Sequence, residues 1–303
     1  METAKSTLKK IRAINRMSAG QRIKSYLRHP LSLTLALLVC LAALITVCML
    51  VFIVVYILAK GIPYLTPSLF ELEYTTENVS LFPAIVTTIE MTLLSLLIAA
   101  PLGILTAVYL VEYAKRGNKL VGLVRLTSET LSGIPSIVYG LFGYLFFVAQ
   151  LKWGYSLLAG SCTLSLMILP LIMRTTEEAL LSVPDTFREA SFGLGAGRLR
   201  TILRVVLPSA VPGILAGVIL GIGRIVGETA ALIYTAGTST DTPHSLMDSG
   251  RTLSIHMYVL SGEGFHTQEA FATAVVLLIT VLGINTLASV IAKALMKTTG
   301  EKS

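Results

Sequence analysis

Residues 175–212 read TTEEALLSVPDTFREASFGLGAGRLRTILRVVLPSAVP, a long polar interruption between two strongly apolar segments. The apolar residues of its first half recur at spacings of four, three and four and therefore share one helical face: Val183, Phe187, Ala190 and Leu194. Thr186 and Glu189, three residues apart, form a candidate capping box. The pattern predicts a short amphipathic helix that begins near Thr186.

A second short helix is predicted after the first one. Three glycines supply the backbone freedom that a turn needs: Gly193, Gly195 and Gly197. The apolar stripe then repeats at Leu199, Ile202, Leu203 and Val206, and we expect the helix to stop at Pro208. Two short helices at an angle, held beside the membrane, make a compact knob that fits a groove on a soluble partner.

Seven residues of this knob resemble the EAA loop of ABC importer permeases: Glu189, Ala190, Ser191, Gly195, Val205, Leu207 and Pro208. Ser191 replaces the second alanine of that motif and Val205 replaces its isoleucine, and neither change prevents a helix. The resemblance implies that Glu189, Ala190, Gly195, Leu207 and Pro208 couple the chain to an ATPase. Amphipathicity alone would instead favour an ordinary helix on the lipid headgroups. We call residues 175–210 the coupling loop.

The composition indicates a polytopic membrane protein and excludes a soluble protein with a single core. Hydrophobic residues make up 54% of the chain, charged residues 14%, and the mean hydropathy is +0.77. We expect an all-α fold with six transmembrane helices. Five apolar stretches are long enough, or nearly so, for the roughly 20 residues that a bilayer requires, and a sixth becomes long enough when its short polar flanks are included. Their approximate ranges are 31–59, 83–111, 135–151, 155–173, 211–237 and 271–295. An amphipathic basic stretch before the third range, KRGNKLVGLVRLTSETLSG, is expected to lie along the membrane surface.

The distribution of Lys and Arg predicts the orientation. With the amino terminus inside, 20 of the 24 basic residues lie on the cytosolic side. The predicted organisation is therefore a cytosolic basic tail (1–30), a six-helix permease domain (31–295) with a cytosolic coupling loop, and a cytosolic carboxyl-terminal tail (296–303). Both termini are expected to be cytosolic in the cytoplasmic (inner) membrane. The inward bias of the basic residues accounts for the net charge of +7, so nucleic-acid binding is not expected. The basic clusters near the amino terminus can contact anionic lipids.

No motif for a resident cofactor is present. The sequence contains no GxxxxGK[ST], HExxH or GxSxG segment, so any ATP and magnesium are expected on another chain. The three cysteines fall inside apolar stretches, which indicates packing and not a disulfide framework. Three histidines share the segment 239–268 at spacings that match no compact metal motif, so no metal site is assigned.

The fifth predicted span carries a stripe of small and charged residues. On a helical wheel, five residues fall within about 80° of one another: Gly213, Gly217, Gly221, Arg224 and Glu228. Glycines at this spacing let another helix approach closely, and charged residues in hydrocarbon are costly unless they pair or line a polar cavity. We expect the stripe to face protein and water. An Arg224–Glu228 ion pair that merely neutralises both charges remains the structural alternative.

Four stretches resemble permeases of the phosphate-specific transport (Pst) family, PstA type: PLGILTAVYLVEY (101–113), SGIPSIVYGLFGY (132–144), RTTEEALLSVPDTFREA (174–190) and GRIVGETAALIYTAG (223–237). The resemblance implies a type I ABC importer permease that moves inorganic phosphate and has no ATPase activity of its own. It also implies three partners: a PstC-type permease in a heterodimer, a PstB-type ATPase dimer, and a PstS-type phosphate-binding protein. Alternatives are a permease for molybdate or sulfate, an ion channel, or a membrane-embedded enzyme.

An anionic substrate suits the charged residues of this resemblance. Arg224 offers a permanent charge and a planar set of donors for phosphate oxygens, and Thr229 could add a hydroxyl. We predict that Glu228 pairs with Arg224 while the pathway is empty. Arg174 lies in the RTTE match, which implies a transport role, although a basic anchor at the inner membrane face explains the same residue.

Overall fold

The computed structural model of the chain describes residues 30–115 and 117–298, so the two predicted tails lie almost entirely outside the described residues. The chain forms two units, Met1–Tyr56 and Ile57–Ser303, which are described separately. The described part of the first unit belongs to one long apolar helix, α3 (Pro30–Gly61). Its 32 residues contain a single charge, Lys60, as predicted for the first span.

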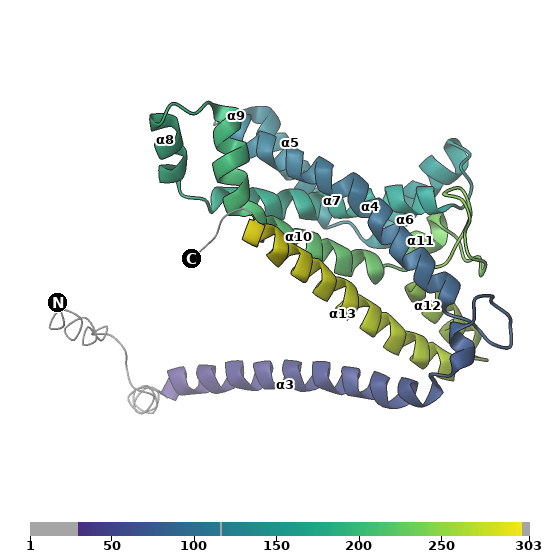
Figure 1. Cartoon of the computed structure of the whole chain (residues 1–303). Helices are drawn as coiled ribbons and strands as arrows, with labels where there is room; N and C mark the ends of the chain where they lie inside the picture. Colours follow the sequence, from purple (N-terminus) through teal and green to yellow (C-terminus); the bar gives the residue numbers. More distant parts are fainter. Residues whose placement is uncertain (1–29, 116, 299–303) are drawn as a thin grey trace. The chain divides into compact units, whose positions relative to one another are not determined.

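The second unit is built from helices, and no strand occurs among the described residues (Figure 1). Its long helices are α4 (Phe82–Val108), α7 (Leu157–Leu181), α10 (Leu207–Val226) and α13 (Thr267–Thr298). Its shorter helices are α5 (Lys119–Ser132), α6 (Ser136–Gly143), α8 (Asp185–Gly193), α9 (Arg198–Thr201), α11 (Ala230–Thr235) and α12 (Leu253–Glu263). Three π-helical segments extend α4, α6 and α9: Tyr109–Tyr113, Tyr144–Gln150 and Ile202–Val206.

Five helices of the described chain are long and apolar enough to cross a membrane, and a sixth span results if one bent pair counts as a span. The bent pair is α5 with Ser136–Gln150, and the two parts meet at 103°. Ile134 precedes Pro135, and a residue before proline disfavours the helical conformation, which explains why the chain turns there. The predicted third span is thus a short helix joined to the amphipathic α5.

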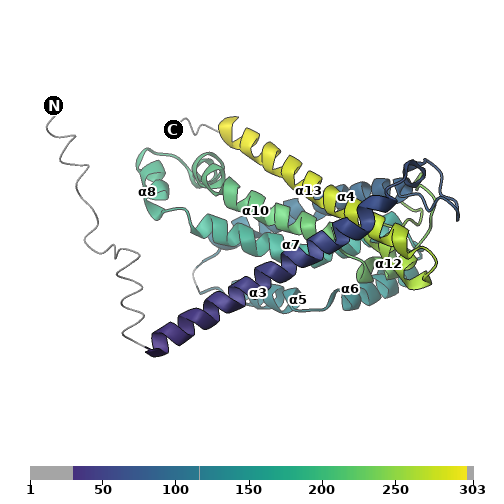
Figure 2. The ribbon, with the colours of Figure 1, turned by 90° about the horizontal axis from the view of Figure 1, so that it is seen from below.

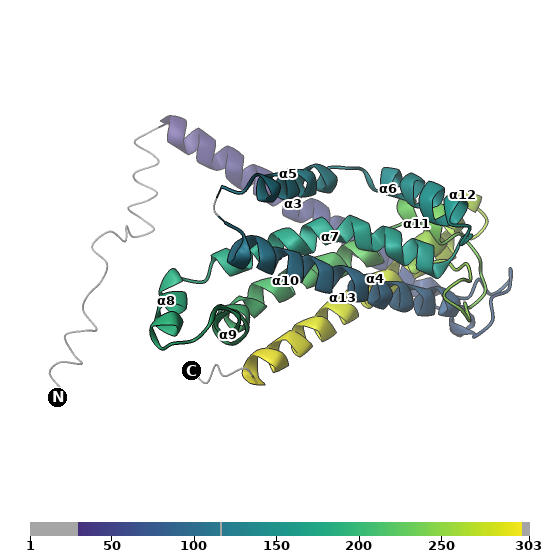
Figure 3. The same cartoon turned by 90° about the horizontal axis from the view of Figure 1, so that it is seen from above.

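Helix α7 occupies the centre of the second unit, and two thirds of its membrane-spanning window is buried (67%). Serine hydroxyls join it to α4, since Ser165 Oγ donates to the Ser95 carbonyl at 3.1 Å and Ser95 Oγ to the Ser161 carbonyl at 3.3 Å. Small polar residues of this kind let helices approach closely in a bilayer. Neighbouring α10 runs beside α7 in both rotated views (Figures 2 and 3).

The glycines of the predicted stripe make the contact between α10 and α7. A Cβ atom on Gly213 would lie 2.6 Å from Ala179 Cβ, and one on Gly217 would lie 2.7 Å from Thr175 Cβ. Neither distance is compatible with a side chain. The prediction that these glycines let another helix approach closely is therefore confirmed.

We expect Gly217→Val to lower the stability of the second unit. Overpacking a tight core contact usually costs roughly 1–3 kcal/mol, and here the contact involves α7 itself. Thermal unfolding of the purified protein in detergent measures the loss. Gly223→Ala is the matched control, because nothing lies within 4 Å of a Cβ at Gly223. Equal midpoints for the two variants would contradict the close packing.

The fifth predicted span, 211–237, is not one continuous helix. Helix α10 ends at Val226, with Gly227 as its C-cap, and α11 begins only at Ala230. Thr229 has φ −123° and ψ −54°, outside regular helix geometry. The span is therefore broken at residues 227–229. The helical wheel that placed Glu228 on one face with Arg224 does not apply beyond Val226.

The predicted stop at Pro208 is also wrong. Residues Arg198–Val226 form one span, and Pro208 lies in the first turn of α10. The π-helical segment Ile202–Val206 comes immediately before it. A helix can pass a proline where such a segment loosens the hydrogen-bond ladder. The second short helix of the coupling loop consequently continues into the membrane span.

The end of the second unit opposite α8 and α9 is closed by α12, the start of α13 and the segment that leads into α4 (Figure 1). Their apolar side chains form one buried cluster: Leu69, Val79, Leu81, Ala84, Leu253, Leu260, Ala270, Ala272 and Val276. His256 of α12 is 0% exposed beside this cluster. Burial first, and then the positive charge of Arg251, lower the pKa of His256 from 6.5 to about 3. The nearby Val79 backbone acts in the opposite direction and raises the pKa of His256, although it makes no hydrogen bond with the ring.

His256 should make the protein less stable in acid. Its folded-state pKa lies below the unfolded value, so the unfolded chain binds more protons between about pH 6.5 and pH 3. The stability that the neutral His256 contributes is fully present above pH 6.5. Between pH 6.5 and about pH 3 the free energy of unfolding falls by about 1.4 kcal/mol per pH unit. Unfolding midpoints at pH 7 and pH 5 should therefore differ less in His256→Gln than in the wild type. The exposed His244 is the control, and an unchanged difference in His256→Gln would contradict the assignment.

Candidate functional site

The coupling loop contains the helix–turn–helix arrangement that its sequence predicts. Helix α8 is followed by a turn at Gly195, whose φ of +83° favours glycine, and then by α9. No residue of α8 is buried within this chain. Large apolar side chains are exposed along the two helices and their turn: Phe187, Phe192, Leu194, Leu199 and Leu203. We call these five residues the apolar patch, and exposed apolar surface of this kind marks a contact with another protein or with the membrane.

The predicted capping box of Thr186 and Glu189 does not form. Helix α8 begins at Asp185, and its N-cap is Pro184, which has no side-chain hydrogen bond to offer. Glu189 and Ala190 are exposed instead. Glu189 is therefore available to a partner rather than used to start its own helix. Leu207 and Pro208 are half-buried at the base of the loop, where α10 begins.

An arginine that precedes Glu189 holds the coupling loop on the helix bundle. Arg188 donates from Nη2 to Glu112 Oε1 at 2.7 Å and from Nε to the same oxygen at 3.1 Å. Glu112 is buried and Arg188 is half-buried, with 9% and 14% of their side chains exposed. Arg188 also donates to the carbonyls of Leu180 and Val183 at the end of α7, at 3.0 and 2.7 Å. This buried ion pair, which we call the brace, links α8 to the end of α4 and the end of α7.

Arg198 strengthens the same junction. Its Nη2 donates to the backbone carbonyl of Glu112, and its guanidinium carbon lies 5.1 Å from the ring centre of Tyr113. Ser191 and Thr201 are hydrogen-bonded at 2.8 Å between the two short helices. No sequence motif points to Glu112, Arg188 or Arg198 as functional residues. Glu112 and Arg188 are 76 positions apart, so no local spacing connects them. The one feature of the sequence that could have pointed to Glu112 is its place as a carboxylate at the end of an apolar span.

Glu228 lies in the break between α10 and α11 and is buried, with 8% exposed. Its Oε1 accepts from the backbone N–H of Ala231 at 3.1 Å, which caps the start of α11. Its backbone carbonyl accepts from Ser254 Oγ at 2.6 Å, which ties the break to α12. The predicted resting ion pair of Glu228 with Arg224 is absent here, because the helix ends before Glu228 and its carboxylate turns to α11.

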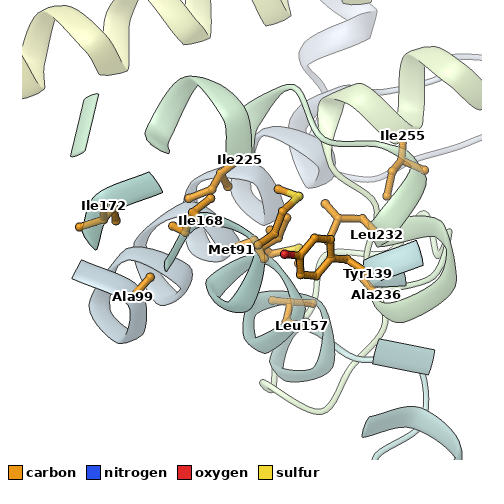
Figure 4. Packing of buried hydrophobic residues seen from close by; sticks show 12 residues of the cluster. Met91, Ala99, Tyr139, Leu157, Ile168, Ile172, Ile225, Leu232, Ala236 and Ile255 are labelled. Carbon is orange, nitrogen blue, oxygen red and sulfur yellow. The ribbon is translucent and has the colours of Figure 1, made fainter. Parts of the chain in front are cut away.

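Arg224 remains half-buried near the end of α10. No ion pair or hydrogen bond to its guanidinium occurs among residues 30–115 and 117–298. Ile225, the residue after Arg224, and Tyr139 belong to the central core cluster (Figure 4). Figure 4 shows Tyr139 beside Met91 and Leu232, while Ile225 points into the same cluster. An unpaired cation next to an apolar core is available to an anionic ligand.

Arg174 and Thr229 line two different cavities, and Arg224 is not among the residues that line either one. Arg174 is 61% exposed and forms a surface ion pair with Glu178, Nε to Oε1 3.3 Å. A second ion pair joins Arg125 Nη2 to Glu177 Oε1 at 2.5 Å. The two pairs line a cleft of about 230 Å³ between α5 and α7. Thr229 lines a separate, mainly apolar cavity of about 830 Å³ between α6, α11, α12 and α13. Within this chain, the four predicted pathway residues therefore do not form one continuous site.

Arg251 is another cation without a counter-ion among the described residues, and it is buried. Arg251 is 4% exposed, and no ion pair to it occurs in the described part of the chain. Its guanidinium carbon lies 4.6 Å from the ring centre of Tyr74. A desolvated cation–π contact contributes about 2 kcal/mol, whereas burying an unpaired ion costs several kcal/mol. The contact with Tyr74 alone does not offset the burial of this charge.

Comparisons with a family model and with known proteins agree on one family of transport proteins. The family model described as "Binding-protein-dependent transport system inner membrane component" matches residues 99–300. The chain is 37% identical over 257 residues to the phosphate transport system permease protein PstA of Pasteurella multocida, covering 84% of this chain and 90% of that protein. It is 35% identical over 208 residues to a probable ABC transporter permease, YqgI, of Bacillus subtilis, covering 63% and 70%.

Solved structures share the fold. A bacterial ABC transporter that imports the acidic polysaccharide alginate matches with a TM-score of 0.64 at 18% identity, over 90% of this chain and 99% of that chain. The alginate transporter bound to its pentasaccharide-loaded periplasmic protein matches with a TM-score of 0.65 at 19% identity, over 90% and 98%. These likenesses confirm the predicted all-α, type I ABC importer permease architecture.

Proposed function

Because this chain belongs to the family of binding-protein-dependent transport system inner membrane components, we propose that it is the PstA-type permease subunit of an ABC importer for inorganic phosphate. The 37% identity to a phosphate permease over 84% of the chain carries the choice of phosphate. The unpaired Arg224 supports an anionic substrate. A molybdate or sulfate permease would have the same coupling loop, and only the substrate separates these alternatives.

The coupling loop takes part in energy transfer and not in catalysis. The apolar patch and the exposed Glu189 and Ala190 provide a surface for a PstB-type ATPase dimer, which would hold ATP and magnesium. A PstC-type permease completes the pathway as a heterodimer, and a PstS-type protein delivers phosphate. We propose no cofactor for this chain itself. A channel or a membrane-embedded enzyme has no need of the apolar patch.

The protein spans the cytoplasmic membrane several times, and we place both termini in the cytosol. The basic residues Arg188, Arg198, Arg200 and Arg204 lie at the end with α8 and α9, which supports a cytosolic coupling loop. A reporter fused after Ser303 should be active only inside the cell, and a reporter inserted within residues 241–263 only outside. The opposite labelling would contradict the placement of the coupling loop beside an ATPase.

Purification of the tagged chain from its host membrane tests the proposal. We expect a soluble ATPase and a second permease to copurify, and ATP hydrolysis to rise when the phosphate-loaded binding protein is added. Replacing Phe187 and Leu194 together by serine should abolish copurification of the ATPase but leave the second permease bound. A chain that purifies alone, with no ATPase under any mild detergent, contradicts the importer assignment.

A further inference from the structure

Arg251 and His256 lie together beneath the segment that leads into α4. Arg251 directly precedes Thr252, the N-cap of α12, and is 4% exposed, while His256 on the first turns of α12 is 0% exposed. The Arg251 guanidinium carbon lies 4.6 Å from the ring centre of Tyr74. The Tyr74 ring meets His256 edge-on, with ring centres 6.1 Å apart. One aromatic ring thus contacts both side chains.

The polar atoms of these two side chains lack partners. Nη2 of Arg251 and both ring nitrogens of His256 are buried without a hydrogen bond. Buried donors are normally satisfied, and each exception needs an explanation such as an unseen ion or ligand. Within residues 30–115 and 117–298 no carboxylate pairs with Arg251. The cluster therefore has a positive charge without a counter-ion in this part of the chain, and buried N–H groups without a hydrogen-bond acceptor.

The cluster is connected to the break in the fifth span. Thr252 and Ser254 are hydrogen-bonded to each other at 2.9 Å, and Ser254 Oγ donates to the Glu228 carbonyl at 2.6 Å. The N–H of Leu253 donates to Thr88 Oγ1 of α4 at 2.9 Å. The start of α12 therefore fixes the position of Arg251 relative to the break that follows Arg224. A negative ligand there would also meet the positive end of the α12 dipole.

We propose that Arg251 and His256 bind one small inorganic oxyanion, which is phosphate under the function proposed above. The guanidinium donates to two of its oxygens and supplies the missing charge balance, and the neutral His256 ring donates to a third oxygen. An arginine that is 4% exposed offers no surface to a side chain of another protein, which favours a small ion as its missing partner. The permease then has two cationic positions for its substrate, Arg251 and Arg224, on either side of residues 227–229.

Equilibrium binding of ³²P-labelled phosphate to the purified permease–ATPase complex, without the binding protein, tests this site. Arg251→Met should remove one bound equivalent per complex, or weaken its binding at least about tenfold, because the charged contact is lost. His256→Gln should weaken the same equivalent less. Lys152→Gln, which removes one exposed charge, is the matched control and should bind as the wild type does. Methionine has a similar volume, and replacing a buried unpaired charge by an apolar side chain is not expected to prevent folding.

The outcomes separate the site from the proposed function. Unchanged stoichiometry and affinity in Arg251→Met overturns the site, even if the complex transports phosphate. Failure of Arg251→Met to assemble also overturns it, since the arginine would then stabilise the fold by itself. Loss of one bound sulfate or molybdate, in a complex that does not bind phosphate, supports the site and contradicts phosphate as the substrate.

Discussion

Replacing Glu112 by alanine is expected to abolish phosphate import while the chain still inserts into the membrane. Arg188 would lose its buried carboxylate partner, and removing one member of a buried ion pair typically costs about 3–5 kcal/mol. The coupling loop would then be detached from the end of α4, so movement of an ATPase would no longer reach the bundle. We expect uptake to fall at least about tenfold, with ATP hydrolysis no longer dependent on substrate.

The same arginine supplies the control for this prediction. Asp185 contacts Arg188 at 3.3 Å but is 76% exposed, and an exposed ion pair contributes at most about 1 kcal/mol. Asp185→Asn should therefore transport nearly as well as the wild type. Arg188→Lys should be intermediate, because lysine keeps the charge but cannot donate to Glu112 and to two carbonyls in one plane. Normal coupling in Glu112→Ala would show that the brace does not transmit movement.

Replacing Arg224 by glutamine is expected to reduce phosphate uptake roughly 10- to 100-fold, the effect of losing one charge-assisted hydrogen bond to the substrate. Glu228→Gln should have a small effect, because the amide oxygen can still accept from the Ala231 N–H. The double variant should resemble Arg224→Gln alone, since the two side chains have different partners. Uptake by each variant is compared at equal abundance in the membrane.

Restored uptake in the double variant would contradict this assignment. Such a result means that Arg224 and Glu228 only neutralise each other, as a pair that uncharged residues of similar size can replace. Glu228→Ala gives a further control, because it removes the cap of α11 at a cost of about 1 kcal/mol without changing Arg224. Its effect should appear in stability more than in the affinity for phosphate.

Local patterns predicted the features that depend on neighbouring residues. The periodicity from Val183 to Leu194 predicted α8, and the glycines after it predicted the turn at Gly195, because helix faces and positive φ are local properties. Hydropathy predicted five of the spans in the same way. The spacing of Gly213 and Gly217 predicted close approach of another helix, which the contact with α7 confirms.

Features that depend on distant residues could not be predicted from such patterns. At the break after Val226, the Glu228 carbonyl accepts from Ser254, which lies 26 residues further along the chain, and a glycine alone does not end a membrane helix. The brace joins residues that no spacing rule connects. The continuation of the helix past Pro208 depends on a π-helical segment that has no sequence signature in this chain. The prediction of an Arg224–Glu228 ion pair was wrong because it assumed that one unbroken helix contains both residues.

Transport by the reconstituted complex tests the central claim most directly. The permease pair, its ATPase and the binding protein are placed in proteoliposomes, and accumulation of labelled phosphate, sulfate and molybdate is measured with and without ATP. We predict ATP-dependent accumulation of phosphate that competes with arsenate and is lost in Arg224→Gln. Accumulation of sulfate or molybdate with no accumulation of phosphate would contradict the assignment of this chain as a phosphate permease.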